Sequence, residues 1–384
     1  MSLNVRKNFY SSKKRRKGGS VVSSIDPYHK KIFRSCWRSM QGLIAILGGK
    51  RSSGKVSVWY AGAQSGNIGG PLVKVQRLKE FFPESRLNFT HAYLLSNCPY
   101  LPMWALKWLK WRRIPIVLNQ NGVFYPAWFD GDYKQKNSEM AKAWQLADYV
   151  FYQSNFCKSS AEKFLGKRSG PGEVLFNAVD LEHFKPDPAR KNTRPILLHT
   201  GKLTRHMLYR VEALLRGFSL ALMKGLDAEL RIAGWMDGFV FTRLTQLVKE
   251  LDLGERVSFL GPYDQRVAPS LYSSADAYVT LTFNDACPSS VIEALACGLP
   301  VLHSASGGVP ELVTEKAGVG LPVENGYDRI DVPSIDLIAD GLAEILNDLP
   351  VRQAAARERA VEAFDIKNWV GRHSAIFEQL SARR

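Results

Sequence analysis

From Val56 onward, short apolar runs alternate with longer segments in which apolar residues recur every three or four positions. In the first half of the chain, strand-like runs occupy residues 56–61, 88–96, 115–121, 149–154 and 172–177. Helix-like segments lie between them, at residues 72–82, 101–113, 138–148 and 155–166. Short apolar runs separated by helical patterns predict βα units and a parallel sheet.

Residues 184–194 are polar and contain prolines, and the alternation restarts after them. We take this stretch as a linker. The expected fold is α/β, with two Rossmann-like, doubly wound domains that face a cleft. The expected segments are an N-terminal domain at 56–185, a C-terminal domain at 195–364 and a final helix within 365–384 that packs back on the first domain. In such sheets, ligands bind outside the carboxyl ends of the strands.

The positive charge is concentrated before this pattern begins. Residues 1–55 hold 14 of the 52 Lys and Arg residues and a single acid, Asp26, so they carry +13 of the net charge of +16. We predict a basic, disordered tail here, which either binds an anionic membrane surface or nucleic acid, or is only a solvated extension. The remaining chain is nearly neutral and contains no nucleic-acid motif, so the nucleic-acid interpretation is disfavoured.

Two further patterns bear on the location of the protein. No run of 18 or more apolar residues exists, so no transmembrane helix is predicted. The five cysteines are scattered, without CxxC or Cys/His spacing typical of a metal site. These patterns predict a cytoplasmic protein, with the basic tail as the one feature that would hold it at the inner face of a membrane.

The segment "NDACPSSVIEALACGLP", residues 284–300, offers several kinds of chemistry. It follows the strand-like run at 277–283, and Pro288 suits the start of a helix. Ser290 and Glu293 fit the S-x-x-E capping box, so Glu293 either caps its own helix or binds a ligand at the helix N-terminus. Cys287 is a candidate nucleophile, although no His–Asn pair accompanies it.

Taken further, "DACPSSVIEALACGLPVLHSASGGVPELV" resembles the signature of the family 4 retaining glycosyltransferases, which have the GT-B fold. Other segments are similar to that family in the family's own order, from residue 56 to the end: "NIGGPLVKVQRL", "NAVDLEHFKP", "HTGKL", "RIAGWMDG", "VSFLGPY" and "SADAYVTLT".

This resemblance implies transfer of a sugar from a nucleotide-diphosphate-sugar to a glycan or lipid-linked acceptor, with no metal and no further cofactor. By the resemblance, Glu293 holds the ribose and Asp285 lies beside the donor sugar. Lys202 pairs with the diphosphate, together with the helix start at Ser289 and Ser290. Gly69 and Gly70 permit a close backbone approach.

The chain departs from the family pattern at three positions. Asp285 replaces the commoner Glu. The second basic phosphate ligand would fall near Met207, so Arg205 or Arg210 takes its place, and we prefer Arg205. Asn121, a candidate catalytic residue with Asp285, stands where many relatives have a His; it can bond a sugar hydroxyl but cannot act as a cationic acid. These departures leave a second interpretation open, a catalytically impaired GT-B protein that serves as a binding or scaffold protein.

Three smaller features have competing interpretations. Asp130-Gly131-Asp132 resembles a D-x-D metal motif, but we expect a solvated loop. His199, at a strand end, is expected to be structural. The aromatic residues at 124–129 either contact sugar or lipid or pack as a loop.

Overall fold

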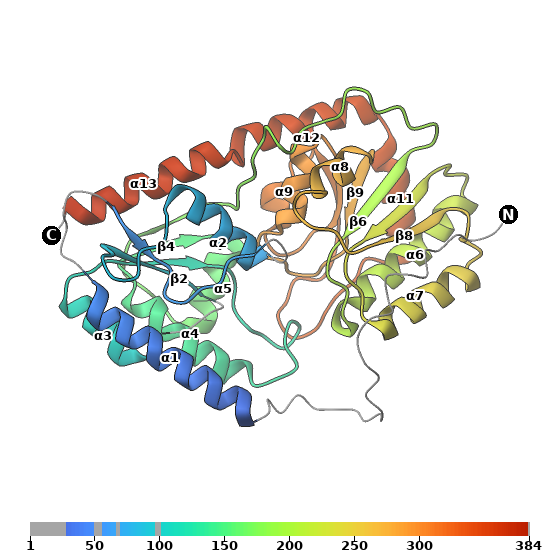
Figure 1. Ribbon diagram of the computed structural model, residues 1–384. Helices are drawn as coiled ribbons and strands as arrows, with labels where there is room; N and C mark the ends of the chain where they lie inside the picture. Colours follow the sequence, from blue (N-terminus) through green and yellow to red (C-terminus); the bar gives the residue numbers. More distant parts are fainter. Residues whose placement is uncertain (1–27, 50–55, 67–69, 97–100, 383–384) are drawn as a thin grey trace.

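The computed structural model describes residues 28–49, 56–66, 70–96 and 101–382. The described chain forms two α/β domains side by side, each built around a parallel sheet (Figure 1). The final helix, α13, lies across the N-terminal domain in the same figure. This is the mixed α/β, two-domain architecture that the alternating pattern predicts.

The N-terminal sheet has five parallel strands in chain order, β1-β2-β3-β4-β5. Every residue of β1 to β4 is buried, because helices cover both faces, and this explains their continuous apolar runs. The elements of this half are α1 (Tyr28–Gly48), β1 (Val58–Trp59), α2 (Gly70–Phe81), β2 (His91–Leu95), α3 (Met103–Trp111), β3 (Ile116–Gln120), α4 (Tyr133–Leu146), β4 (Tyr149–Tyr152), α5 (Asn155–Leu165) and β5 (Gly172–Val174).

The C-terminal sheet has the order β11-β10-β9-β6-β7-β8, the doubly wound Rossmann arrangement. Its elements are β6 (Ile196–Thr200), the 3-10 turn η2 (Arg205–Met207), α6 (Leu208–Met223), β7 (Glu229–Ala233), α7 (Gly238–Glu250), β8 (Val257–Gly261), α8 (Ala268–Ser273), β9 (Ala277–Thr280), α9 (Ser289–Ala296), β10 (Val301–Ser304), α10 (Val309–Leu312), β11 (Gly318–Leu321), α11 (Ile335–Leu346), α12 (Leu349–Ala363) and α13 (Ile366–Ala382). The strand order reverses between β6 and β9, which pair directly, so the crevice for a ligand lies at the ends of these two strands.

The last helix joins the two halves of the chain. After α12 has packed on α9 in the C-terminal domain, α13 buries its apolar face in the core of the N-terminal domain. Trp369, Ile376 and Phe377 there share one cluster with residues of β1, β2 and α2. The Phe377 ring meets Phe82 edge-on, with ring centroids 5.2 Å apart. The N-terminal domain therefore needs the C-terminal end of the chain to complete its core.

One expectation fails near the start of the chain. Residues 28–48 lie inside the predicted disordered tail of 1–55, yet they form the 21-residue helix α1. Ala45 of this helix is fully buried in the core of the N-terminal domain, which gives the helix a tertiary contact that composition alone does not reveal. The predicted tail residues before Tyr28 lie outside the described part. Within that part, no helix is both long and apolar enough to cross a membrane.

Phe377→Ala tests the role of α13. The ring is fully buried, so its removal should lower the free energy of unfolding by about 3–5 kcal/mol. The control is Phe239→Ala in α7. This side chain is half exposed, so its removal should lower the free energy of unfolding by less than about 1 kcal/mol. Urea unfolding followed by tryptophan fluorescence measures both. Equal losses for the two variants would contradict the packing of α13 described here.

Candidate functional site

A cavity of about 1040 Å³ lies between the two domains, at the carboxyl ends of their strands. Its N-terminal wall comes from the start of α2 and the loop after β3, and its C-terminal wall from the loops after β6, β7, β8 and β9. Six of the residues predicted from the sequence line it: Asn121, Lys202, Asp285, Ser289, Ser290 and Glu293. The volume is sufficient for a ligand of nucleotide-sugar size.

The loop after β9 is held in a fixed shape by close backbone contacts. Asn284 adopts a left-handed conformation with φ 56°, and its carbonyl oxygen accepts a 3.2 Å hydrogen bond from the Tyr125 hydroxyl of the other domain. A Cβ at Gly307 would lie 2.5 Å from the Asp285 carbonyl oxygen, and one at Gly308 would lie 2.0 Å from that of Ala286. The Gly-Gly pair is therefore required for the loop to bring Asp285 to the cavity.

Asp285 itself lies at the cavity wall with a desolvated carboxyl group. Burial raises the pKa of Asp285, although the Cys287 backbone N–H, 3.2 Å from Oδ1, and the nearby Arg210 act in the opposite direction. Among the described residues, no ion pair within 4 Å offsets this burial. Such a carboxylate is suited to interact with a ligand that enters the cavity.

Glu293 does not cap its helix, contrary to one of the two interpretations of the sequence. The helix α9 begins at Ser289 with Pro288 as its N-cap, and no side chain caps it, because Pro288 offers no hydrogen-bonding side chain. Glu293 therefore lies too far along the helix, and its Oε1 instead accepts hydrogen bonds of 3.2 Å from Arg77 and from Gln265. Its side chain is 3% exposed, and burial raises its pKa.

Ser289 and Ser290 are the first two residues of α9 and line the cavity. The Val291 N–H donates to the Pro288 carbonyl at 3.1 Å, so the N–H groups of the two serines precede the first helical hydrogen bond. The N-terminal end of the helix therefore directs donors and a partial positive charge toward the cavity.

The basic residues after β6 are arranged differently from our preference. Lys202 lines the cavity, with Nζ 5.2 Å from the centre of the Trp235 ring. Arg205, which we preferred, lies outside the cavity lining, with its guanidinium 4.2 Å from the centre of the exposed Phe239 ring. Arg210 lines the cavity instead, because it lies one helical turn further along, on the buried face of α6.

Arg210 is buried next to the loop that carries Lys202. It donates to Thr282 Oγ1 at 2.7 Å and to the Lys202 carbonyl at 3.4 Å, and burial lowers its pKa. Its Nε is buried without a hydrogen-bond partner among the described residues. A buried donor of this kind at a cavity wall favours an anionic ligand.

A third cationic group, which the sequence analysis did not single out, faces the same cavity from α2. Lys74 is buried, and its Nζ donates to Asn119 Oδ1 at 2.8 Å and to Asn121 Oδ1 at 3.3 Å. Gln153 Nε2 also donates to Asn121 Oδ1, at 2.6 Å. Burial, with a smaller contribution from the neighbouring Arg77, lowers the pKa of Lys74 to about 7. The sequence feature that could have identified Lys74 is its position on the apolar side of the predicted helix at 72–82.

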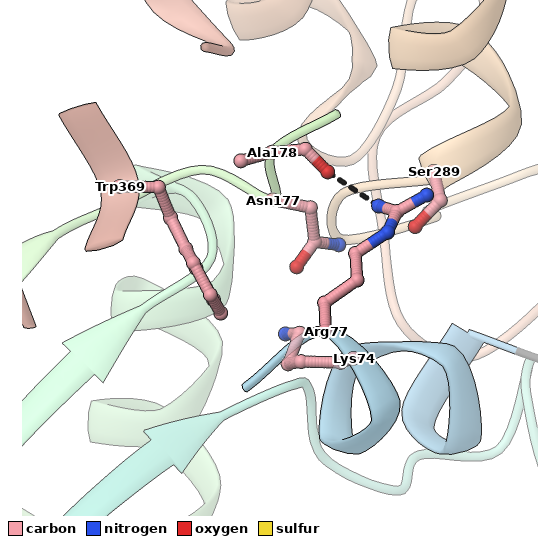
Figure 2. A pocket seen from close by; sticks show the side chains of 6 residues that line it. All are labelled: Lys74, Arg77, Asn177, Ala178, Ser289 and Trp369. Carbon is pink, nitrogen blue, oxygen red and sulfur yellow. Dashed lines mark hydrogen bonds between the residues drawn. The ribbon is translucent and has the colours of Figure 1, made fainter. Parts of the chain in front are cut away.

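Arg77, one turn after Lys74, spans the boundary between the domains. Figure 2 shows its side chain extending from α2 toward Ala178 and Ser289, with a hydrogen bond from Nη1 to the Ala178 carbonyl. A small space of about 10 Å³, roughly one water molecule, lies among Lys74, Arg77, Asn177, Ala178, Ser289 and Trp369. The ion pair between Arg77 and Glu293 therefore lies in a packed contact between the domains.

The remaining candidates have structural surroundings. Burial raises the pKa of the Cys287 thiol to about 12, so it stays protonated near neutral pH and is a poor nucleophile. His199 is buried on β6, and burial lowers its pKa to about 3, in line with a structural role. Asp132 caps α4 by accepting from the Gln135 N–H at 2.9 Å.

Two further predictions concern the loops on the N-terminal side. Phe124, Tyr125 and Trp128 line the cavity, and Phe129 packs against Phe124 with centroids 5.1 Å apart, so the aromatic loop is both packed and part of the wall. Gly70 is the first residue of α2, and Gly69 lies outside the described residues.

The second half of the chain matches a family model. Residues 180–361 match the model for "Glycosyl transferases group 1". They belong to that family. The match contains the charged cavity-wall residues Lys202, Arg210, Asp285 and Glu293.

Curated relatives agree with this family assignment. The chain is 26% identical over 208 residues to N-acetyl-alpha-D-glucosaminyl L-malate synthase of Bacillus anthracis, covering 53% of this chain and 51% of the relative. It is 31% identical over 196 residues to D-inositol 3-phosphate glycosyltransferase of Corynebacterium diphtheriae, covering 47% and 43%. The chain thus spans about half the length of these curated relatives, or less.

Solved structures support the GT-B fold over both domains. Sucrose-phosphate synthase from Thermosynechococcus elongatus has a TM-score of 0.62 at 19% identity, covering 77% of this chain and 75% of that one. Anabaena HepE in complex with UDP-glucose has a TM-score of 0.59 at 18% identity, covering 82% of each chain. At these identities the likeness concerns the fold.

The low pKa of Lys74 predicts how stability depends on pH. The folded value of about 7 lies below the unfolded value of about 10.4, so between these pH values the unfolded chain binds more protons. The free energy of unfolding should therefore rise by a few kcal/mol from pH 7 toward pH 10, relative to Lys74→Met, in which this contribution is absent. Urea unfolding across the pH range measures the difference. The exposed Lys249→Met is the control, and if its profile were shifted as much as that of Lys74→Met, the burial of Lys74 would be contradicted.

Proposed function

We propose that this protein transfers a sugar from a nucleotide-diphosphate-sugar to a glycan or lipid-linked acceptor, with retention at the anomeric carbon and without a metal. The observation that carries the proposal is the set of groups around one interdomain cavity, in which two carboxylates, Asp285 and Glu293, lie with the cations Lys202 and Arg210. A nucleotide-sugar has ribose hydroxyls for a carboxylate, a diphosphate for the cations and a sugar for the second carboxylate. The UDP and UDP-glucose bound by Anabaena HepE are consistent with such a donor.

In this proposal the C-terminal domain holds the donor. Glu293 accepts hydrogen bonds from the ribose hydroxyls, in place of those from Arg77 and Gln265. Lys202, Arg210 and the N–H groups at the start of α9 surround the diphosphate. Trp235 and Tyr263 line the same cavity wall and provide aromatic surface for the base.

The chemical step moves negative charge onto the leaving group. The bond between the anomeric carbon and the diphosphate oxygen breaks, the acceptor oxygen bonds to that carbon, and its proton passes to the released phosphate oxygen. Lys202, Arg210 and the helix N-terminus then stabilise the diphosphate charge that grows in the transition state. Asp285 lies beside the sugar and interacts with the positive charge that develops at the anomeric carbon.

Lys74 lies next to Asn121, the position at which the resemblance leads us to expect a histidine. Its ammonium group lies 3.3 Å from Asn121 Oδ1, so a group that titrates near neutral pH is present where many relatives carry a His. We assign to Lys74 and Asn121 together the polar contact with the donor sugar. The alternative, a catalytically impaired binding protein, would require that this pair does not serve catalysis.

The ribose contact has a direct test. A thermal-shift screen across nucleotide-sugars first identifies the base, since a ligand that binds the folded state raises its stability. The affinity of that nucleoside diphosphate is then compared with those of its 2′-deoxy and 3′-deoxy forms. Wild type should bind a deoxy form about 10-fold or more weakly than the ribose form. Glu293→Ala should bind both forms with nearly equal affinity, because the carboxylate that contacts the ribose hydroxyls is gone.

The matched control is Glu250→Ala, an acid at the end of α7 outside the cavity lining, which should behave like wild type. If Glu293→Ala still bound the ribose form more tightly than both deoxy forms, Glu293 would not be the residue that contacts the ribose.

Catalysis is tested separately, by release of nucleoside diphosphate from the donor. Asp285→Asn should lower kcat/KM by about 100-fold or more while donor affinity changes little, because its contact strengthens only in the transition state. The control is Asp264→Asn, an acid that lines the cavity wall and pairs with Arg266. Equal turnover by Asp285→Asn and wild type would favour the binding-protein alternative.

A further inference from the structure

The helix α1 is oriented opposite to an ordinary helix at a protein surface. Its small and polar residues Gln41, Gly42, Ala45 and Gly48 face the N-terminal domain and are buried. Ile44 packs against the core, but several other large apolar residues face outward, with Phe33 68% and Leu47 78% exposed. Surface helices of soluble domains usually turn their apolar stripe toward the core.

The outward residues form one narrow stripe. They recur at intervals of three or four, as one face of a helix requires: Ile32 or Phe33, Cys36, Met40, Leu43 and Leu47. We refer to these six residues as the outward stripe. All are exposed, so no described part of the chain covers the stripe.

The domain side of α1 explains why the large residues point away. A Cβ at Gly42 would lie 2.2 Å from the Trp104 ring, and one at Gly48 would lie 2.1 Å from the Arg86 carbonyl oxygen, so the helix backbone lies directly on the domain. Arg38 also turns inward and forms a 3.0 Å ion pair with Glu139 of α4. The orientation of α1 is therefore fixed by several independent contacts.

The stripe continues onto the neighbouring helix α3, which packs beside α1 at the outer side of the N-terminal domain (Figure 1). Trp104, which lies on Gly42, and Trp111 are both exposed. Together, α1 and α3 carry seven of the 19 exposed large apolar side chains found among the described residues. An apolar concentration of this kind marks an interaction surface.

Basic side chains lie on both helices of this surface, although Lys110 and Arg38 are paired with the acids Asp148 and Glu139. Lys107 and Lys110 of α3 and Arg113 just after it are exposed, as is Arg34 of α1. In the sequence, α1 follows directly after 27 residues with seven Lys or Arg and one acid. Exposed aliphatic and aromatic residues flanked by Lys and Arg are typical of helices that lie in the interface of an anionic membrane.

We propose that the outward stripe of α1, with the adjoining face of α3, is a docking surface for an anionic lipid bilayer. In the docked state α1 lies along the membrane plane, with the stripe among the acyl chains and the basic residues at the headgroups. The basic tail adds long-range attraction, and the stripe supplies the binding that salt does not screen. This inference does not rest on the proposed glycosyl transfer.

Two other occupants fit the surface less well. Residues 1–27 contain no apolar run longer than two residues, so they offer no matching apolar face. A second copy of the chain would bring two basic surfaces together, and like charges oppose such pairing. An anionic bilayer matches both the apolar stripe and the surrounding charge.

The experiment measures cosedimentation of the full chain with vesicles of phosphatidylcholine containing phosphatidylglycerol, and with vesicles of phosphatidylcholine alone. Wild type should bind the anionic vesicles and bind the neutral ones more weakly. The triple variant Phe33→Ser, Leu43→Ser, Leu47→Ser should bind anionic vesicles about 100-fold more weakly. The control triple variant Met223→Ser, Val351→Ser, Val361→Ser changes similarly exposed apolar residues of α6 and α12 and should bind like wild type.

A second readout locates the contact. Cys36 is exposed on the stripe, whereas Cys157, Cys287 and Cys297 are buried, so in a Cys98→Ser background a polarity-sensitive thiol dye labels Cys36. Its emission should shift to the blue on addition of anionic vesicles at high salt. The same dye on Val351→Cys, in a background that also carries Cys36→Ser, should not shift.

The proposal fails under any of three outcomes. The stripe variant could bind anionic vesicles as tightly as wild type, which would assign binding to the tail alone. Wild type could bind no vesicles, or it could form a dimer that only the stripe variant loses. Circular dichroism should show that each variant folds like wild type, because serine at an exposed position leaves the core intact.

Discussion

The contact of Arg77 with Glu293 is the interaction on which the site depends, because it joins the N-terminal helix α2 to the donor-side helix α9. The two groups lie 3.2 Å apart and are largely buried, and Arg77 also donates to the Ala178 carbonyl of the segment that connects the domains. A buried ion pair of this kind loses much of its attraction to desolvation, so it sets geometry more than it adds stability. It joins the two walls of the cavity, and in the proposed mechanism the ribose takes the place of Arg77 at Glu293.

The two parallel sheets explain why the other groups meet at the interdomain cavity. Asn121 and Gln153 follow β3 and β4, and Asp285 follows β9, so each leaves the carboxyl end of a buried strand. The sequence predicted these strands well, because both faces are covered and the runs are continuously apolar. It also placed Asp285, Glu293 and Lys202 at one cavity, since residues at strand ends are brought together by the fold.

The errors have physical causes that a single sequence conceals. The capping pattern at Ser290 is local, and Pro288 shifts the helix start so that Glu293 falls beyond capping reach. The choice between Arg205 and Arg210 depends on the phase of α6, which starts only after a 3-10 turn. Lys74 is one polar residue within the helical pattern at 72–82, so the sequence does not mark it as a site residue. Helix α1 falls inside the predicted tail because the basic composition of residues 1–55 outweighs the stripe of apolar residues.

The most direct measurement is a crystal structure of the protein with the nucleotide-sugar that stabilises it most in solution. The account predicts the ribose at Glu293, the diphosphate at Lys202, Arg210 and the start of α9, and the sugar beside Asp285 and Asn121. A nucleotide-sugar found outside the interdomain cavity, or bound there with its diphosphate away from Lys202 and Arg210, would contradict it.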